Sequence, residues 1–175
     1  FQGYNRLKDV TRCGCLAHMR RYWHEALPGK SKKSPDKTPA EIGFDYCNQL
    51  FELEKAYADL DADTRKAKRL ETEPAIWEAY WSWLETVKPA GGSRLAKAVT
   101  YAKNQKPYME NYLLDGRCSI SNNIAENIAR PYAVGRKNFL FHDTVKGARA
   151  SSIIYSLVET AKLNHLNIYA YLETV

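Results

Sequence analysis

The chain has 175 residues, which suits one domain with an appendage and leaves little room for two large ones. Hydrophobic residues make up 45% of it, so the composition excludes wholesale disorder. Basic side chains (26) outnumber acidic ones (20), and this excess favours nucleic acid or another polyanion as partner over an acidic one.

The apolar runs are too short to span a bilayer, and the first residues lack the features of a signal peptide. We therefore expect a cytoplasmic protein with no membrane partner, whose four cysteines are reduced thiols. The sequence also lacks an initiator Met, which suggests a piece cut from a longer chain.

The first predicted elements are a strand and a helix. Residues 9–16 are partly β-branched and roughly alternating, which indicates a strand. Residues 16–27 carry apolar side chains at helical spacing and end at Pro28, which indicates a helix. Residues 28–38, rich in Pro, Gly, Ser and Lys, form either a solvated connection or an arm that contacts phosphates.

Two long helices should follow. Thr38, Pro39 and Glu41 have the pattern of a capping box, and the helix should run to about residue 60. The next helical stretch covers residues 62–88, and Pro74 should kink or divide it. Its tryptophans recur at helical spacing, which is more typical of a core than of a ligand site.

The C-terminal half should also be helical. Further helices are predicted over residues 93–103, 107–114, 119–130, 147–164 and 167–172. Pro131 should end the third of these, and residues 132–145 should be irregular with a short β segment at 139–141. The fold class is therefore mainly α, with one or two short strands. A lone strand cannot satisfy its own ladder, so the strand at 9–16 pairs with residues 139–141 or with sequence outside this chain.

One acid stands out among the candidate site residues. Glu126 follows the pair Asn122 and Asn123, and Arg130 comes one helical turn later. By spacing alone, such an acid is usually a surface ion-pair partner, and paired asparagines are usually a cap or a turn.

A basic run surrounds this acid. Residues 127–149 carry five cations against the single acid Asp143. Arg136, Lys137 and Asn138 are expected in a turn, where donors could converge on phosphates. Interleaved aromatic residues suit a nucleic-acid groove, and the alternative is a solvated loop over ordinary core aromatics.

Cys13, Cys15 and His18 form the remaining cluster. A zinc site would need a fourth ligand, and none is evident in the sequence. Small buried thiols beside a hydrogen-bonded histidine are the simpler interpretation, and a zinc-stabilised domain is the alternative.

Several segments resemble insertion-sequence-66 family transposases. The C-terminal signature of that family is similar to residues 121–126 (SNNIAE), 130–131 (RP) and 135–141 (GRKNFLF). Further similar stretches are residues 14–21, 97–105 and 155–172, so the resemblance covers essentially the whole chain.

This resemblance implies a DDE transposase with a ribonuclease-H-like core and DNA as its substrate. Such enzymes hold two divalent cations, Mg²⁺ or Mn²⁺, on two Asp and one Glu, and support in-line attack at phosphorus. Glu126 matches the family's Glu. By the same resemblance, Cys15 and His18 should have a structural role near the active site, and the full-length protein should form a homo-oligomer.

Both catalytic Asp residues are missing, since the second would lie just upstream of Phe1. We therefore expect the C-terminal part of a transposase, inactive alone and without a bound metal. Residues 1–27 would be the last core strand and the following helix, 28–115 a helical insertion, and 116–175 the Glu-bearing and C-terminal helices. The lysine-rich loop and the basic residues 64–69 of the insertion are candidate DNA or subunit contacts. The alternative is a non-catalytic helical module that binds DNA or assembles subunits.

Overall fold

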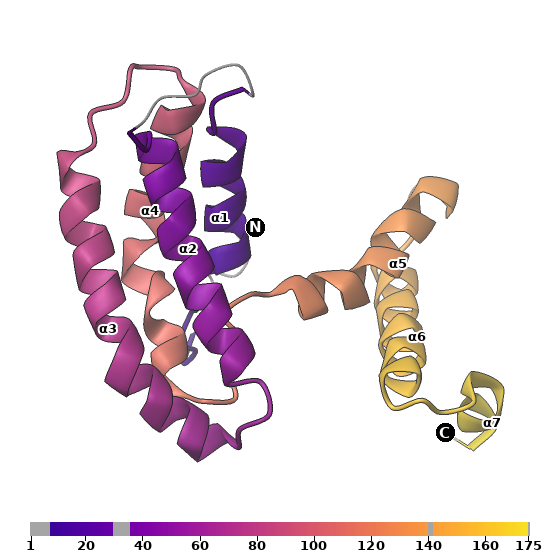
Figure 1. Ribbon diagram of the computed structural model, residues 1–175. Helices are drawn as coiled ribbons and strands as arrows, with labels where there is room; N and C mark the ends of the chain where they lie inside the picture. The colour runs from indigo at the N-terminus through magenta and orange to yellow at the C-terminus, as the bar shows by residue number, and fades with distance from the viewer. Residues whose placement is uncertain (1–7, 30–35, 140–141, 175) are drawn as a thin grey trace. The chain divides into compact units, whose positions relative to one another are not determined.

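The computed structural model describes residues 8–29, 36–139 and 142–174. It divides the chain into two compact units, Phe1–Asn122 (unit 1) and Asn123–Val175 (unit 2) (Figure 1). The described residues form seven α-helices, one 3-10 helix and no strand, so the mainly helical class is confirmed. The predicted parts 1–27, 28–115 and 116–175 describe the organisation of a longer protein, and this division stays a prediction.

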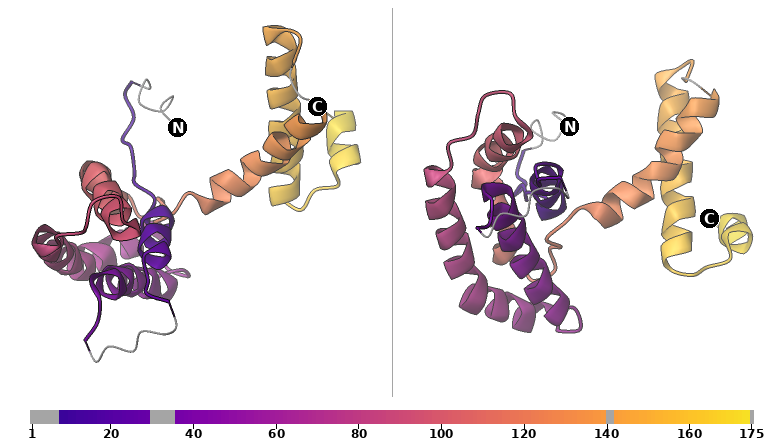
Figure 2. Two further views of the ribbon diagram at one scale, coloured as in Figure 1. Left: turned by 90° about the horizontal axis from the view of Figure 1, so that it is seen from above. Right: turned by 45° about the horizontal axis from the view of Figure 1, so that its top comes forward.

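The four helices of unit 1 form a bundle. They are α1 (Leu16–Glu25), α2 (Pro39–Ala56), α3 (Ala62–Thr86) and α4 (Arg94–Met109), and the 3-10 helix η2 (Asn111–Leu114) follows α4. Helix α1 packs on α2 and α4, and α2 packs on α3. Figure 2 shows this bundle from above, in a view that looks roughly along its helices.

Side-chain caps set the starts of these helices. The predicted capping box is confirmed, because the Glu41 backbone N–H donates to Thr38 Oγ1 and the Thr38 backbone N–H donates to Glu41 Oε2 (2.7 Å). Asp61 accepts from two backbone N–H groups at the start of α3, and Ser93 accepts from Ala96 N–H at the start of α4.

Aromatic side chains dominate the core of unit 1. Trp23 and Trp77 are fully buried. Trp23 Nε1 donates to the Tyr80 hydroxyl and Trp77 Nε1 to the Tyr112 hydroxyl (both 3.1 Å), so each indole ring is packed while its N–H has a partner. Gly43 of α2 lies directly against the Trp23 ring, and a Cβ there would come within 2.5 Å of it. The expectation that the α3 tryptophans belong to the core is confirmed.

The predicted division of the helix at Pro74 and the predicted helix end before Pro107 are wrong, while a kink at Pro74 stays a prediction. Helix α3 runs unbroken through Pro74, and α4 runs through Pro107 to Met109, where η2 takes over. Proline removes one hydrogen bond to the carbonyl four residues earlier, here Leu70 for Pro74. Leu70 and Pro74 both lie on the exposed side of α3, where water can donate a hydrogen bond to the Leu70 carbonyl oxygen. Buried residues on the other side of α3 hold the helix in place.

The predicted strand at residues 9–16 is not formed either. Residues 10–15 run without regular structure. The Gly14 N–H donates to the carbonyl oxygen of Tyr108 in the last turn of α4 (2.7 Å), and the Arg12 carbonyl oxygen accepts from Asn111 Nδ2 (2.7 Å). Of the predicted β segment, Phe139 is the last residue of a helix, and residues 140–141 lie outside the described residues.

Unit 2 contains α5 (Asn123–Phe139), α6 (Val145–Leu163) and α7 (Ile168–Thr174), and α6 packs on both others. Helix α5 continues through Pro131, so the expected end of the helix there is wrong. The Tyr132 ring lies edge-on to Tyr155 (5.1 Å between centroids), and its hydroxyl hydrogen-bonds His142 Nε2 (2.9 Å).

Unit 2 leaves much of its apolar surface uncovered. Of its described residues, only Glu159 and Ala161 are buried. Its exposed large apolar side chains are Ile124, Val134, Val145, Ile153, Ile154, Leu163, Leu166, Tyr169 and Leu172. In the part of the chain that the structure describes, no helix combines the length and apolar character needed to cross a bilayer.

Candidate metal and DNA-binding site

Glu126 lies in the first turn of α5 and is exposed. A carboxylate is favourable at this end of a helix, because the first backbone N–H groups carry partial positive charge. Asn123 begins the helix and Asn122 precedes it, both exposed. Arg130, also exposed, follows at i+4 and therefore lies on the same side of α5 as Glu126.

Arg136, Lys137 and Asn138 lie within α5, so the turn expected for them is wrong. They lie in its last turn, where the backbone N–H groups already donate to carbonyl oxygens one turn earlier, so a backbone cradle for phosphate does not form there. Their side chains lie outside what the structure describes, and their role in binding DNA stays a prediction.

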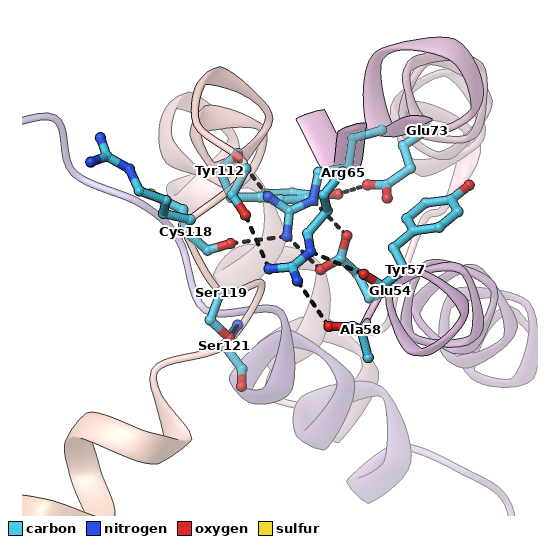
Figure 3. A network of polar contacts seen from close by, with 12 residues as sticks. Glu54, Tyr57, Ala58, Arg65, Glu73, Tyr112, Cys118, Ser119 and Ser121 are labelled. Carbon is cyan, nitrogen blue, oxygen red and sulfur yellow. Dashed lines mark hydrogen bonds and ion pairs between the residues drawn. The ribbon is translucent and has the colours of Figure 1, made fainter. Parts of the chain in front are cut away.

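The segment that leads into α5 is fastened to unit 1 by a buried arginine. Arg69 of α3 is 1% exposed and binds Glu54 of α2 through two hydrogen bonds of 2.6 Å. Its remaining N–H groups donate to the carbonyl oxygens of Tyr112, Asp115 and Cys118 (3.2, 3.2 and 2.9 Å). Figure 3 shows this network, in which Glu54, Tyr112 and Cys118 converge from separate parts of the chain.

Arg65, one turn earlier on α3, ties down the neighbouring chain. Between α2 and α3 it donates to the carbonyl oxygens of Tyr57 and Ala58 (Figure 3). It also donates to those of Leu60 (2.8 Å) and Gly116 (3.1 Å). Gly116 passes so close to Ala62 that a Cβ would overlap its carbonyl oxygen. Further along, the Leu16 N–H donates to the Ile120 carbonyl oxygen (3.0 Å), so the segment is held until shortly before Glu126.

The DNA or subunit contacts predicted at residues 64–69 are wrong for these two arginines and stay a prediction for Lys66 and Lys68. Arg65 is half-buried and Arg69 is buried, and both bind inside unit 1. Sequence reasoning missed this role. The sequence did contain a signal for it. Arg65 and Arg69 are four residues apart, and the same face of the helix continues at the same spacing with Glu73 and the core residue Trp77.

A buried acid completes the network. Glu73 is fully buried and accepts a hydrogen bond from the Tyr112 hydroxyl, which in turn accepts from Trp77 Nε1 (3.1 Å). Burial raises the pKa of Glu73 to about 7, because the charged carboxylate is disfavoured away from water. Burial also raises the pKa of the Tyr112 hydroxyl.

Cys15 is the residue before α1, and His18 lies half-buried in its first turn. Cys13 is hydrogen-bonded to Cys118, and burial together with that neighbouring thiol raises the pKa of Cys13. Over residues 8–29, 36–139 and 142–174, no three His, Cys, Asp or Glu side chains are grouped to hold a metal ion. The structural role of Cys15 and His18 near an active site stays a prediction.

The chemistry available at Glu126 is that of a single exposed carboxylate. Mg²⁺ and Mn²⁺ prefer oxygen ligands and take about six of them, so one carboxylate can supply only part of a site. A carboxylate such as that of Glu126 can supply one of these oxygen ligands.

The family model described as "Transposase IS66 family" matches residues 1–150. Three similar proteins come from Sinorhizobium fredii (strain NBRC 101917 / NGR234). The uncharacterized protein y4qI is 33% identical to this chain, and the match covers 90% of the chain and 29% of y4qI. The uncharacterized protein y4hP is 27% identical, over 95% of the chain and 32% of its own length. The uncharacterized protein y4jD is 29% identical, over 99% of the chain and 34% of its own length. The chain thus spans about a third of the length of these relatives. No solved structure matches it significantly.

Proposed function

Because the chain belongs to the IS66 family of transposases, we propose that it is the C-terminal part of a DDE transposase that cuts and joins DNA. In this proposal Glu126 is one of three carboxylates that hold two Mg²⁺ or Mn²⁺ ions. Both catalytic Asp residues lie upstream in the longer protein, so this chain is inactive alone. The similar proteins are about three times as long as the region that matches this chain, which supports the proposal that it is part of a longer protein.

The observation that carries the proposal is the exposed position of Glu126 at the start of α5, within the segment that the family model matches. When bound, the two cations activate the attacking oxygen and stabilise the leaving oxygen of an in-line displacement at phosphorus. Glu126 contributes a negatively charged oxygen ligand. The hydrogen bonds from Arg65, Arg69 and Leu16 limit the movement of the segment that precedes it.

The uncovered apolar side chains of unit 2 support a further part of the proposal. A unit of this size that buries so little cannot offset the conformational entropy lost on folding. We propose that α5 and α6 are the remnant of a ribonuclease-H-like core, and that strands from the upstream part of the protein cover Ile124, Ile153 and Ile154.

Contacts with the DNA backbone are assigned to residues of α5. Arg130 is exposed on the Glu126 side of the helix, and Arg136, Lys137 and Asn138 follow on the same helix. Arginine, lysine and asparagine are frequent donors to phosphate oxygens, and such contacts position DNA without reading its sequence.

The test is metal-dependent strand cleavage by a full-length protein that contains this region. With Mg²⁺ or Mn²⁺ and DNA carrying the element ends, the wild-type protein should cleave, and Glu126→Gln should abolish cleavage. Asp143→Asn, which removes another exposed acid of unit 2, is the matched control and should retain it. Full activity in Glu126→Gln would overturn the proposal.

The second candidate function is a non-catalytic helical module that binds DNA or assembles subunits. The observation that favours it is that unit 1 has its own aromatic core, while the described residues hold no complete metal site. It predicts salt-sensitive DNA binding by this chain that Glu126→Gln leaves unchanged and Arg136→Ala or Lys137→Ala weakens. Light scattering on the full-length protein would test the proposed homo-oligomer.

A further inference from the structure

A groove runs between α1 and α4 on the surface of unit 1, far along the chain from Glu126. It has a volume of about 440 Å³ and is lined by Tyr22, Gly92, Ala96, Lys97, Thr100, Tyr101 and Asn104. We call it the α1–α4 groove. Its floor includes the small residues Gly92 and Ala96, which let an extended ligand approach the backbone closely.

Helix α4 presents a polar and aromatic face to this groove. Arg94, Lys97, Tyr101, Asn104 and Tyr108 recur at intervals of three or four residues and so share one side of the helix. The opposite side packs into the core through Ala98, Val99, Ala102 and Met109. On this face Arg94, Lys97 and Asn104 are exposed, whereas Tyr101 and Tyr108 are half-buried.

Two aromatic contacts order the side chains along the groove. The Tyr22 and Tyr101 rings are stacked, with centroids 4.5 Å apart and an angle of 28°. The Arg12 guanidinium lies 4.2 Å from the centroid of the Tyr108 ring and also donates to Gln105 Oε1 (3.3 Å). Side chains that are already ordered lose less conformational entropy when a ligand binds.

The charge of the groove is positive. Lys97 lines the groove, and α4 contains no Asp or Glu between Arg94 and Met109. Arg21 of α1 adds a cation beside Tyr22, whereas Lys103 pairs with Glu85 (2.8 Å) and Lys106 lies over the Trp81 ring, so these two cations do not line the groove. Glu25, 3.9 Å from Arg21, is an acid at this end of α1. Burial raises the pKa of Tyr101 to about 12, while Arg21 and Arg12 act in the opposite direction. The phenol is therefore neutral at physiological pH and can donate a hydrogen bond to an anion.

We propose that the α1–α4 groove binds the sugar–phosphate backbone of DNA. Lysine, tyrosine, asparagine and threonine side chains line the groove, and Arg21 lies beside its Tyr22. All five types are side chains that contact phosphate oxygens. Tyrosine rings beside cations also suit the sugar and base edges of nucleic acid. The choice of DNA rests on the proposed function, but the groove is a binding surface separate in sequence from the α5 residues assigned above.

The test is DNA binding by the 175-residue chain without divalent cations, measured by fluorescence anisotropy over a range of salt concentrations. The double variant Arg21→Gln with Lys97→Gln removes two cations of the groove. The matched control, Lys103→Gln with Lys55→Gln, removes two exposed cations of α4 and α2 that do not line the groove. Each double variant includes one cation with an acidic partner, since Lys103 pairs with Glu85 as Arg21 does with Glu25.

The groove variant should bind about tenfold more weakly at low salt, and the slope of log affinity against log salt should fall by about two, because two fewer phosphates are neutralised. The control should bind like the wild type. Equal reductions in affinity for both double variants, an unchanged affinity for the groove variant, or no binding by the wild-type chain would each overturn the proposal. Circular dichroism should show that all variants remain folded.

The outcome is independent of the metal site. Glu126→Gln should leave the affinity in this assay unchanged, because no divalent cation is present and Glu126 lies on another helix. If full-length Glu126→Gln cleaved DNA normally while the groove variant still bound DNA more weakly, the proposed catalytic role would fail and the groove would stand. If full-length Glu126→Gln failed to cleave DNA while the groove variant bound DNA like the wild type, the groove proposal would fail and the catalytic role would stand.

Discussion

Replacing Arg69 by methionine should cost a large part of the stability of unit 1. The change keeps an unbranched chain of similar length but removes five hydrogen bonds, two to Glu54 and three to carbonyl oxygens. Glu54, whose side chain is only 12% exposed, would lose its partner inside the protein. Removing one member of a buried ion pair typically costs about 3–5 kcal/mol, against about 5–15 kcal/mol for the unfolding of a whole domain.

The assay is urea unfolding followed by tryptophan fluorescence, since Trp23 and Trp77 are fully buried. Lys68→Met, at an exposed neighbour on the same helix, is the control and should change the free energy of unfolding by less than about 0.5 kcal/mol. Adding Glu54→Leu to Arg69→Met should recover part of the stability, because the Glu54 carboxylate is then no longer left without its partner. A destabilisation below about 1 kcal/mol, or a double variant no more stable than the single one, would refute this role of Arg69.

Two further predictions concern unit 1. Because the pKa of Glu73 is raised to about 7 in the folded state, its contribution to the free energy of unfolding is present below its ordinary pKa and is lost as pH rises towards 7. Glu73→Gln should therefore remove part of the fall in stability between about pH 4.5 and 7, and identical profiles for the two proteins would contradict it. Gly43→Ala should lower the free energy of unfolding by about 1–3 kcal/mol, since its Cβ would overlap the Trp23 ring. Gly91→Ala, with nothing within 4 Å of the added Cβ, is the control, and equal effects of the two would argue against the close packing of α1 on α2.

Local signals in the sequence predicted the parts of the fold that depend on neighbouring residues. The capping box at Thr38 and the cap at Ser93 could be predicted because their hydrogen bonds join residues three apart in sequence. The core position of Trp77 followed from helical spacing. The family was also recognisable, because short segments such as residues 121–126 keep their order and spacing.

Features that depend on distant parts of the chain could not be predicted in the same way. The burial of Arg69 requires three carbonyl oxygens that come more than forty residues later, so its sequence neighbours gave only an exposed basic stretch. Pro74 sits inside α3 because packing of the buried side of that helix outweighs one missing hydrogen bond. Pro131 likewise lies inside α5. The strand expected at residues 9–16 instead makes its backbone hydrogen bonds to Tyr108 and Ile120.

The proposal that Glu126 holds a catalytic cation is tested most directly by Mn²⁺ binding to a full-length protein that contains this region. Electron paramagnetic resonance measures the free Mn²⁺ that remains at each total concentration. Glu126→Gln should weaken binding at least about tenfold, or 1.4 kcal/mol, while Asp143→Asn should bind like the wild type. Unchanged Mn²⁺ affinity in Glu126→Gln would contradict the assignment of this carboxylate as a metal ligand.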